Sequence, residues 1–385
     1  MMKIAIVNRY FPPSKASTGD LAREFAEKMG RLFPQDQLII IATDAEYKGG
    51  WSDGKIIPTE VLRTSSYYDG SSQVLRFVSG LIEGRQLAKK AFQEADVVLS
   101  MTNPPLVNLW MGREANRTNK PLIEWTLDLY PLALHTSNNL SSQHPLYRWF
   151  KSQVESYPPD YHLFLGEGQR QKVQETLGYS RPYSIYPCGY KKVEASSERP
   201  SWKQEYGQDD IWIGYVGNIG EAHSLDALAR FGRMLPSHIH LVFSSYGAKS
   251  LMLKQELKKS PNIHWAEAIP DTELPHLDLQ LVSLLPSWTH VSVPSKAVSS
   301  ISMGIPIIFI GEKESDTWQM FGDAGWHLQE DFSPQALEAL FGELTPKEIQ
   351  KKQKQASHLS KSIENQIEGS ITQVKTFIEG YRKTL

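Results

Sequence analysis

The sequence predicts an α/β protein of two Rossmann-like, doubly wound domains that face each other across a cleft. Short apolar runs alternate with amphipathic stretches of helical period along most of the 385 residues. The apolar runs are continuous, which is typical of parallel strands covered by helices on both faces. The alternation stops around residues 191–210, where polar residues dominate, and then restarts. Two successive domains therefore account for the whole pattern.

In the first half, runs rich in Val, Ile and Leu predict strands, and the stretches between them carry apolar residues at helical spacing. The expected strands cover residues 3–10, 36–44, 96–101, 120–128, 160–166 and 183–190. The expected helices cover residues 18–33, 72–95, 105–118, 144–157 and 167–179. Strand and helix thus alternate in chain order, as a parallel sheet requires.

The second half repeats this alternation without repeating the residues. The expected strands cover residues 211–220, 238–247, 262–269, 277–287, 305–311 and 326–330. The expected helices cover residues 224–235, 249–260, 314–325 and 333–344, followed by a helical tail over 358–385. We expect a first domain at 1–189, a second at 190–360 and a separate helix at 361–385, whose apolar residues form one stripe.

Composition excludes several classes of protein. The formal net charge of −2 and a pI of about 6.6 give no bulk attraction for nucleic acid. The single cysteine, Cys188, rules out a disulfide framework. The apolar run at the N-terminus is too short for a signal peptide, and no run approaches the ~20 residues of a membrane helix. We expect a cytoplasmic protein, with peripheral contact to the inner face of the membrane left open.

Two segments of the second half have the features of anion sites. Gly217, Asn218, Ile219 and Gly220 form a tight turn between an expected strand and a helix, where backbone N–H groups can meet an anion. An ordinary glycine turn explains this segment equally well. Pro294, Ser295 and Lys296 would start another helix, with a hydroxyl and a cation beside free backbone donors. The alternative is a capped helix with a surface lysine.

The first half offers one comparable segment. Pro13 and Ser14 belong to a stiff loop after the first expected strand, and Ser17 and Thr18 open a helix, so the segment is either a ligand contact or a capped loop. No Asp-x-Asp sequence and no set of His, Cys and carboxylate residues with metal-ligand spacing occurs in the chain. We therefore expect no metal and no cofactor.

At these residues the chain resembles a known family, the GT-B retaining glycosyltransferases of family 4, in the bacterial subgroup that makes capsule, exopolysaccharide and O-antigen. The matching stretches are YFPPSKASTGDLAREFAEKM near the start, LDLYP at 127–131, YVGNIGEAHSLDAL at 215–228 and VPSKAVSSISMGIPIIFI at 293–310. The likeness covers nearly the whole chain, and the last two motifs occur in the family's order and spacing.

The resemblance implies roles for the two domains and for particular residues. The first domain would bind the acceptor, the second the nucleotide-diphosphate sugar, with UDP or GDP as its nucleotide, and the tail helix would cross back to the first domain. Contacts to the donor are implied for Gly217, Asn218, Ile219, Gly220, Ser245, Ile269, Ser287, Pro294, Ser295 and Lys296. Contacts on the acceptor side are implied for Pro13, Ser14, Ser17 and Thr18. Catalytic roles are implied for Lys296, Asp128 and Glu124, and the serines around Lys296 would lie beside the diphosphate.

The chain departs from the family pattern at several positions. Many members carry glutamates where this chain has Val291 and Ser299, and a histidine where it has Leu127. The common Arg and Lys-Glu pair after the first strand of the second domain is replaced by Asn218 and by residues 221–223. These losses affect recognition of the sugar or ribose.

We therefore predict a metal-independent, retaining, hexosyl-type glycosyltransferase of surface polysaccharide biosynthesis. It would act on a glycan or a lipid-linked glycan. The alternative is a degenerate, non-catalytic GT-B protein that binds a sugar nucleotide or a protein partner. A third reading, a sugar-nucleotide epimerase, lacks an evident set of carboxylates and histidines.

Overall fold

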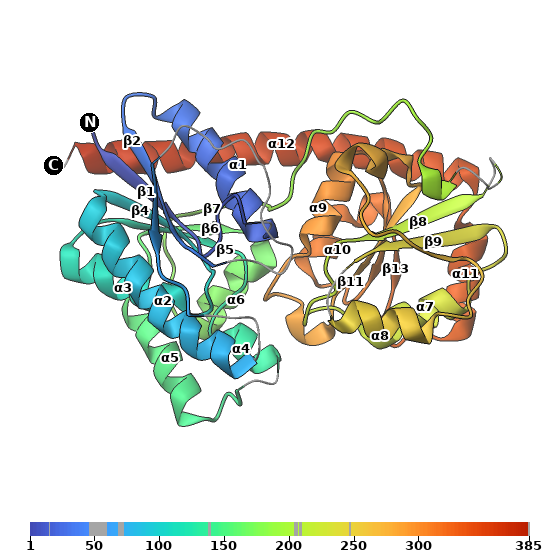
Figure 1. Cartoon of the computed structure of the whole chain (residues 1–385), viewed down its shortest axis with the longest axis horizontal. Helices are drawn as coiled ribbons and strands as arrows, with labels where there is room; N and C mark the ends of the chain where they lie inside the picture. The colour runs from blue at the N-terminus through green and yellow to red at the C-terminus, as the bar shows by residue number, and fades with distance from the viewer. Residues whose placement is uncertain are drawn as a thin grey trace. The chain divides into compact units, whose positions relative to one another are not determined.

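The computed structural model describes residues 1–14, 16–45, 60–67, 73–137, 140–203, 207, 210–245 and 248–383. The chain divides into two compact units (Figure 1). Unit 1 comprises Met1–Tyr186 together with Ile367–Leu385, and unit 2 comprises Pro187–Gln366. Each unit has its own parallel sheet, of seven and six strands. The prediction of two doubly wound α/β domains is confirmed.

Unit 1 is a seven-stranded sheet in the order β3-β2-β1-β4-β5-β6-β7. Its strands are β1 (Lys3–Val7), β2 (Gln37–Thr43), β3 (Glu60–Thr64), β4 (Val97–Met101), β5 (Leu122–Thr126), β6 (Tyr161–Phe164) and β7 (Tyr183–Ile185). Its helices are α1 (Ser17–Leu32), α2 (Gln73–Glu94), α3 (Val107–Thr118), α4 (Leu132–Thr136), α5 (Pro145–Ser156) and α6 (Glu167–Leu177). The sequence did not predict β3, because this edge strand is half exposed and lacks an apolar run.

Helices cover both faces of the unit 1 sheet, as the continuous apolar strands require. On one face, α2 and α3 pack through Leu87 and Met111 against strand residues such as Val7 and Val98. On the other face, the Phe25 ring of α1 lies 5.3 Å from the Trp125 ring of β5.

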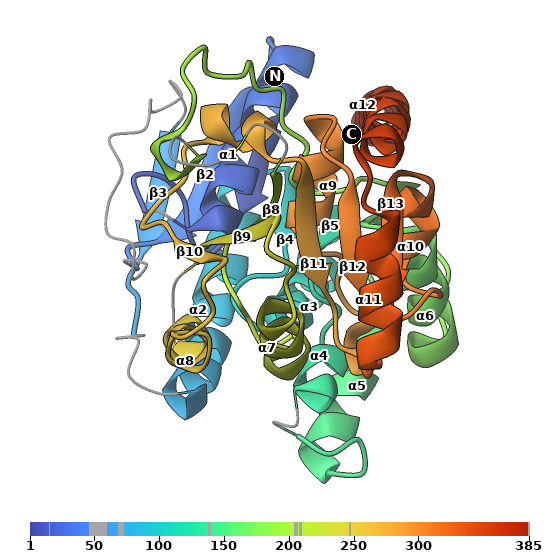
Figure 2. The same cartoon turned by 90° about the vertical axis from the view of Figure 1, so that its right-hand side faces the viewer.

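Unit 2 is a six-stranded parallel sheet in the order β10-β9-β8-β11-β12-β13. Its strands are β8 (Ile211–Val216), β9 (Ile239–Ser244), β10 (Ile263–Trp265), β11 (Leu279–Ser283), β12 (Ile307–Ile310) and β13 (Gly325–Leu328). Its helices are α7 (Leu225–Arg233), α8 (Ala248–Glu256), α9 (Ser295–Ser302), α10 (Asp316–Phe321) and α11 (Pro334–Glu343). The helices α7, α8 and α11 cover one face, and α9 lies on the other (Figure 2).

The last helix, α12 (Pro346–Arg382), takes part in both units. Its residues from Ile367 onward belong to unit 1, where they lie along β7, the last strand of the sheet. The hydroxyl of Ser370 donates to the carbonyl oxygen of Ile185 at 2.6 Å, and Arg382 forms an ion pair with Asp36. The predicted apolar stripe is buried, including Ile367, Ile371, Val374 and Ile378. The structure places the change of unit at Gln366/Ile367, within the helix.

A close approach between helices in unit 1 provides a test of this packing. A Cβ atom on Gly112 of α3 would lie 2.0 Å from the carbonyl oxygen of Tyr157, which follows α5. We expect Gly112→Ala to lower the free energy of unfolding by about 1–3 kcal/mol, because the two helices must separate. Urea denaturation measures this change.

The matched control is Gly369→Ala in the part of α12 that belongs to unit 1, where an added Cβ meets nothing within 4 Å. This substitution should raise the free energy of unfolding by up to about 1 kcal/mol, because alanine favours the helix. Equal effects of the two substitutions would contradict the close contact between α3 and α5.

Candidate functional site

The candidate site lies where the strand order of unit 2 reverses. The strands β8 and β11 are neighbours in the sheet, but their connections run to opposite sides. In open parallel sheets, ligands bind beyond the carboxyl ends of the strands at such a switch point. The segment after β8 is the loop 217–223, and the segment after β11 leads to α9. Both anion-type segments predicted from the sequence therefore flank this point.

Three hydrogen bonds join the two segments. Lys296 Nζ donates to the carbonyl oxygen of Asn218 at 3.2 Å. The backbone N–H of Leu285 donates to the carbonyl oxygen of Ala222 at 2.8 Å. His223 Nδ1 lies 2.6 Å from the carbonyl oxygen of Ser283. The structure thus brings the predicted residues around Asn218 and Lys296 together.

Gly217 is required by the backbone at the start of the loop. Its φ of +111° lies in the region that side chains rarely adopt. Its N–H donates to the carbonyl oxygen of Ser244 at the end of β9, at 2.9 Å. Gly220 has no positive φ, and an added Cβ there would lie 3.7 Å from Asn218 Nδ2. Only the first glycine of the motif is therefore explained by local conformation.

Lys296 is a cation without a counter-ion. Its ammonium lies 3.8 Å from the centroid of the buried Tyr215 ring, and no described carboxylate forms an ion pair with it. The side chain keeps partial exposure to solvent, yet the protein around the ammonium lowers its pKa to about 7 through desolvation. An incoming anion would supply the missing charge partner. This is the electrostatic signature of an anion site.

Another glycine, Gly189, packs closely against the backbone at the start of α9. Gly189 has a φ of +90°, and a Cβ on it would lie 2.8 Å from the carbonyl oxygen of Ser295. Ser295 itself is exposed, and no side chain caps the helix that begins there. Within the first turn, the N–H of Ala297 donates to the carbonyl oxygen of Pro294 at 2.9 Å, so the backbone itself caps this end of the helix in part.

The other serines of α9 have structural roles, which corrects the expectation that they lie beside a diphosphate. Ser300 is buried, and Ser299 Oγ donates to the carbonyl oxygen of Lys296 at 3.2 Å. Ser302 Oγ accepts from the backbone N–H of Lys191 at 3.1 Å, and the carbonyl oxygen of Ser302 accepts from Ser360 Oγ at 2.9 Å. These bonds tie α9 to the segment after Gly189 and to α12.

The remaining donor-side predictions occupy different surroundings. Ser245 follows β9, and its hydroxyl lies 2.8 Å from that of Ser250. Ser287 is exposed in the turn after β11. Ile269 is buried in an apolar cluster with Trp212, and its N–H donates to Ser244 Oγ at 3.2 Å. The Ile269 side chain therefore belongs to the core, and only its backbone lies near the strand ends.

Sequence reasoning missed Lys249, the second residue of α8. Its ammonium donates to the carbonyl oxygen of Gly220 at 3.0 Å, and the carbonyl oxygens of Glu221 and His223 lie at 3.5 and 3.4 Å. The residues around Lys249 match no known motif. Its position after an expected strand was the one feature that could have indicated a role. Burial, with the charges of Lys296 and Lys249, holds the pKa of His223 well below its usual value, so this imidazole is neutral.

The two carboxylates predicted for catalysis differ in accessibility. Asp128 is partly exposed just after β5, and Thr102 Oγ1 accepts from its backbone N–H at 3.1 Å. Glu124 lies in the middle of β5 and is 5% exposed. Its carboxylate accepts from Thr126 Oγ1 at 3.0 Å, and burial raises its pKa to about 7. This burial argues against direct contact between Glu124 and an acceptor hydroxyl, and the catalytic role of this residue stays a prediction.

The acceptor-side residues follow β1, which with β4 flanks the switch point of unit 1. Ser14 is buried, and its hydroxyl has no hydrogen-bond partner among the described residues. Thr18 Oγ1 accepts from Asn103 Nδ2 at 3.2 Å, Ser17 is exposed, and Pro13 is partly exposed. These four residues therefore lie beside the carboxyl ends of the central strands β1 and β4.

A buried ion pair supports this edge and was not anticipated. Arg9 and Glu83 are 1% and 0% exposed, and their charged groups are 2.8 Å apart. Glu83 also accepts from Ser66 Oγ at 2.8 Å and from the N–H of Tyr67 at 2.9 Å. The pair links β1, α2 and the segment after β3. Sequence alone could not pair two charges this far apart in the chain.

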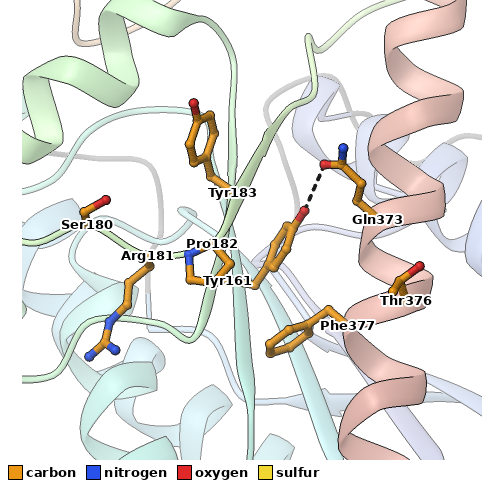
Figure 3. Close-up of a pocket in the computed structure, with 8 residues that line it drawn as sticks. All are labelled: Tyr161, Ser180, Arg181, Pro182, Tyr183, Gln373, Thr376 and Phe377. Carbon is orange, nitrogen blue, oxygen red and sulfur yellow. Dashed lines mark hydrogen bonds between the residues drawn. The ribbon is translucent and has the colours of Figure 1, made fainter.

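A surface groove beside the tail helix is not part of either switch point. A groove of about 730 Å³ lies in unit 1 between the β6–β7 side of the sheet and α12, with Tyr161, Tyr183 and Phe377 among its walls (Figure 3). Tyr161 donates to Gln373 Oε1 at 3.3 Å across its floor. None of the predicted site residues lines it.

The described residues contain no group of three or more His, Cys, Asp or Glu side chains arranged to hold a metal ion. None of the described helices is both long enough and apolar enough to cross a bilayer.

Solved structures share this architecture over its full length. Sucrose-phosphate synthase from Thermosynechococcus elongatus matches with a TM-score of 0.69 and 11% identity, covering 100% of this chain and 99% of that chain. HepE from Anabaena, in complex with UDP and glucose, matches with 0.66 and 12% over 100% of both chains. WaaG, a glycosyltransferase involved in lipopolysaccharide biosynthesis, matches with 0.66 and 15% over 98% of this chain and 100% of that one. Neither a protein-family model nor a curated protein matches this sequence.

At these identities the likeness establishes the fold, which is GT-B. The fold does not by itself select a reaction. A UDP-N-acetylglucosamine 2-epimerase matches too, with a TM-score of 0.59 and 13% identity over 99% of this chain and 98% of that chain. The family 4 assignment remains a prediction. The chemistry of the site residues therefore decides which activity the fold can support.

The pKa of Lys296 predicts that this residue opposes folding. The folded-state pKa of about 7 lies below the ordinary value of 10.5, so the unfolded chain binds more protons between these values. Stability should therefore rise as the pH increases from 7 to 10, and Lys296→Met should unfold at a higher temperature than the wild type. The difference should be largest at pH 7 and below, and should shrink toward pH 10.

Thermal unfolding followed by circular dichroism at pH 6, 7, 8.5 and 10 measures this effect. Lys259→Met, at an exposed position of the same unit, is the control and should show no such dependence on pH. A Lys296→Met variant that is less stable than the wild type at pH 7 would mean that the ammonium contributes to the fold.

Proposed function

We propose that this protein is a glycosyltransferase that moves a sugar from a nucleotide-diphosphate sugar to a hydroxyl group of an acceptor. The observation that carries the proposal is the ammonium of Lys296, which lies at the switch point of unit 2 and forms no ion pair with a carboxylate of the described residues. A diphosphate beside it would gain a cation, the first-turn N–H groups of α9 and the loop 217–223.

In the proposed reaction, the bond between the anomeric carbon and the diphosphate oxygen breaks. Negative charge develops on the leaving diphosphate, and Lys296 stabilises it as a point charge. The acceptor oxygen forms the new bond, and its proton passes to an oxygen of the leaving diphosphate. Attack on the same face would retain the anomeric configuration without a nucleophilic carboxylate. Asp128, the accessible carboxylate of the two, would orient the acceptor.

The finer assignment rests on likeness and on surface chemistry. HepE is described with UDP and glucose, and WaaG with lipopolysaccharide biosynthesis, which supports UDP over GDP and a surface glycan or lipid-linked glycan as acceptor. On α5, Leu146 and Trp149 are 40% and 42% exposed, and Arg148 lies between them. An apolar pair with a cation supports peripheral contact with an anionic membrane.

A non-catalytic sugar-nucleotide protein is the second candidate. The positions where the resembling family carries glutamates hold Val291, which is buried, and Ser299, which bonds to the backbone of its own helix. Neither can bond to a sugar hydroxyl as a carboxylate would. An epimerase, the third reading, would release an altered sugar nucleotide without any acceptor. Analysis of the products formed from each donor, with and without a polysaccharide extract, distinguishes the three.

A screen of UDP- and GDP-sugars by thermal shift identifies the donor. A ligand at 100 times its dissociation constant should add about 2.7 kcal/mol to stability. With the donor known, Lys296→Ala should lower kcat by about 10²–10³, because one charge at the developing anion is lost. Lys259→Ala should behave as the wild type. Wild-type kinetics for Lys296→Ala on the true donor would remove this residue from the site.

Removal of divalent metal should leave the rate of transfer unchanged. We expect this because Lys296 supplies the positive charge and the sequence has no Asp-x-Asp pair to hold a metal on the diphosphate. The measurement compares initial rates before and after exhaustive dialysis against EDTA. Loss of activity that Mg²⁺ or Mn²⁺ restores would overturn the metal-independent mechanism.

A further inference from the structure

The loop 217–223 is held by a second lysine that arrives from the neighbouring strand. Lys249 lies in α8, directly after β9, and β9 is paired with β8 in the sheet. Its ammonium donates to the carbonyl oxygen of Gly220 at 3.0 Å. The carbonyl oxygens of Glu221 and His223 lie within 3.5 Å of the same ammonium. The ammonium of Lys249 therefore contacts three backbone carbonyl oxygens of a single loop.

This contact fixes the direction of the loop's amide groups. A peptide unit is planar and trans, so its N–H points away from its own carbonyl oxygen. When the carbonyls of Gly220 and Glu221 face Lys249, the N–H groups of the next residues, Glu221 and Ala222, face the opposite way. A cluster of carbonyls repels anions, and Lys249 turns that face of the loop away from a ligand.

The loop is anchored on its other side by the β11 segment. The N–H of Leu285 donates to the carbonyl oxygen of Ala222 at 2.8 Å, and His223 Nδ1 lies 2.6 Å from that of Ser283. The loop contacts two cations, since Lys296 donates to the carbonyl oxygen of Asn218 and Lys249 to that of Gly220. Lys296 forms no ion pair among the described residues, whereas Lys249 bonds to the carbonyls and interacts with the charge of Glu221. The two lysines therefore have different tasks.

We propose that Lys249 is a positioning residue, which holds the loop 217–223 in the shape that receives the diphosphate without touching the ligand itself. The ligand in this inference, a diphosphate, rests on the proposed function. The contact between Lys249 and the loop does not depend on that function. Lys249→Met keeps the length of the side chain and removes the cation. Lys249→Arg keeps the cation, and Lys254→Met, an exposed position on the same helix, is the matched control.

The first measurement needs no ligand. Amide hydrogen exchange over residues 217–224 should become at least tenfold faster in Lys249→Met, because a charge-assisted bond to the loop is lost. Exchange should return toward the wild-type rate in Lys249→Arg and stay unchanged in Lys254→Met. Unchanged exchange in Lys249→Met would overturn the inference, whatever the protein binds.

The second measurement uses UDP and uridine, and GDP and guanosine, as probes in calorimetric titration. Lys249→Met should bind the diphosphate roughly tenfold more weakly or worse while its affinity for the nucleoside is kept, because only the phosphate end meets the loop. Lys249→Arg should restore binding. Faster exchange with unchanged affinity would overturn the role in binding.

Two other outcomes separate the inference from the function that it assumes. Weaker binding without faster exchange would mean that Lys249 contacts the diphosphate directly, which contradicts a positioning role. A wild-type protein that binds neither UDP nor GDP would refute the proposed function, and the exchange data would still show whether Lys249 orders the loop.

Discussion

The contact on which the unit 2 site depends is the bond between Lys296 and the carbonyl oxygen of Asn218. It joins the segments that follow β8 and β11, the two strands whose connections diverge. The ammonium remains charged only at a cost, because the protein desolvates it and offers an aromatic face and one carbonyl in place of a carboxylate. An anion bound beside this ammonium would meet a charge that is already in place, which is the condition for electrostatic preorganisation.

The fold followed from the sequence because continuous apolar runs carry the signal of a parallel sheet covered on both faces. The strand β3 was not predicted, because an edge strand buries too little side-chain surface to need a continuous apolar run. Gly217 was found because it directly follows β8 in a glycine-containing turn, and Lys296 because Pro294 and Ser295 mark the start of a helix. Lys249, Arg9 and Glu83 were not found, because their partners lie far away in the chain and carbonyl oxygens leave no mark on the sequence.

Glu124 is a different case. A carboxylate in an apolar strand suggests function, yet β5 is buried on both faces. Glu124 accepts a hydrogen bond from Thr126 and is paired in register with His162 of β6. Burial lowers the pKa of His162 to about 3, so this imidazole is uncharged at neutral pH. Burial raises the pKa of Glu124 to about 7, so this carboxyl is partly protonated there. The sequence shows that a carboxylate lies in this strand. The surroundings of that carboxylate depend on the register of the neighbouring strands, which the sequence alone does not show.

The docking of α12 along β7 has a consequence for the order in which the protein assembles. The β7 end of the unit 1 sheet is contacted by residues from Ile367 onward, which are synthesised after all of unit 2. All of unit 2 is therefore synthesised while β7 presents unpaired backbone groups and while the place of Ile371 and Val374 in unit 1 is empty. Unit 1 is therefore completed only after unit 2 has been synthesised, and until then the β7 edge of its sheet is open to strand addition.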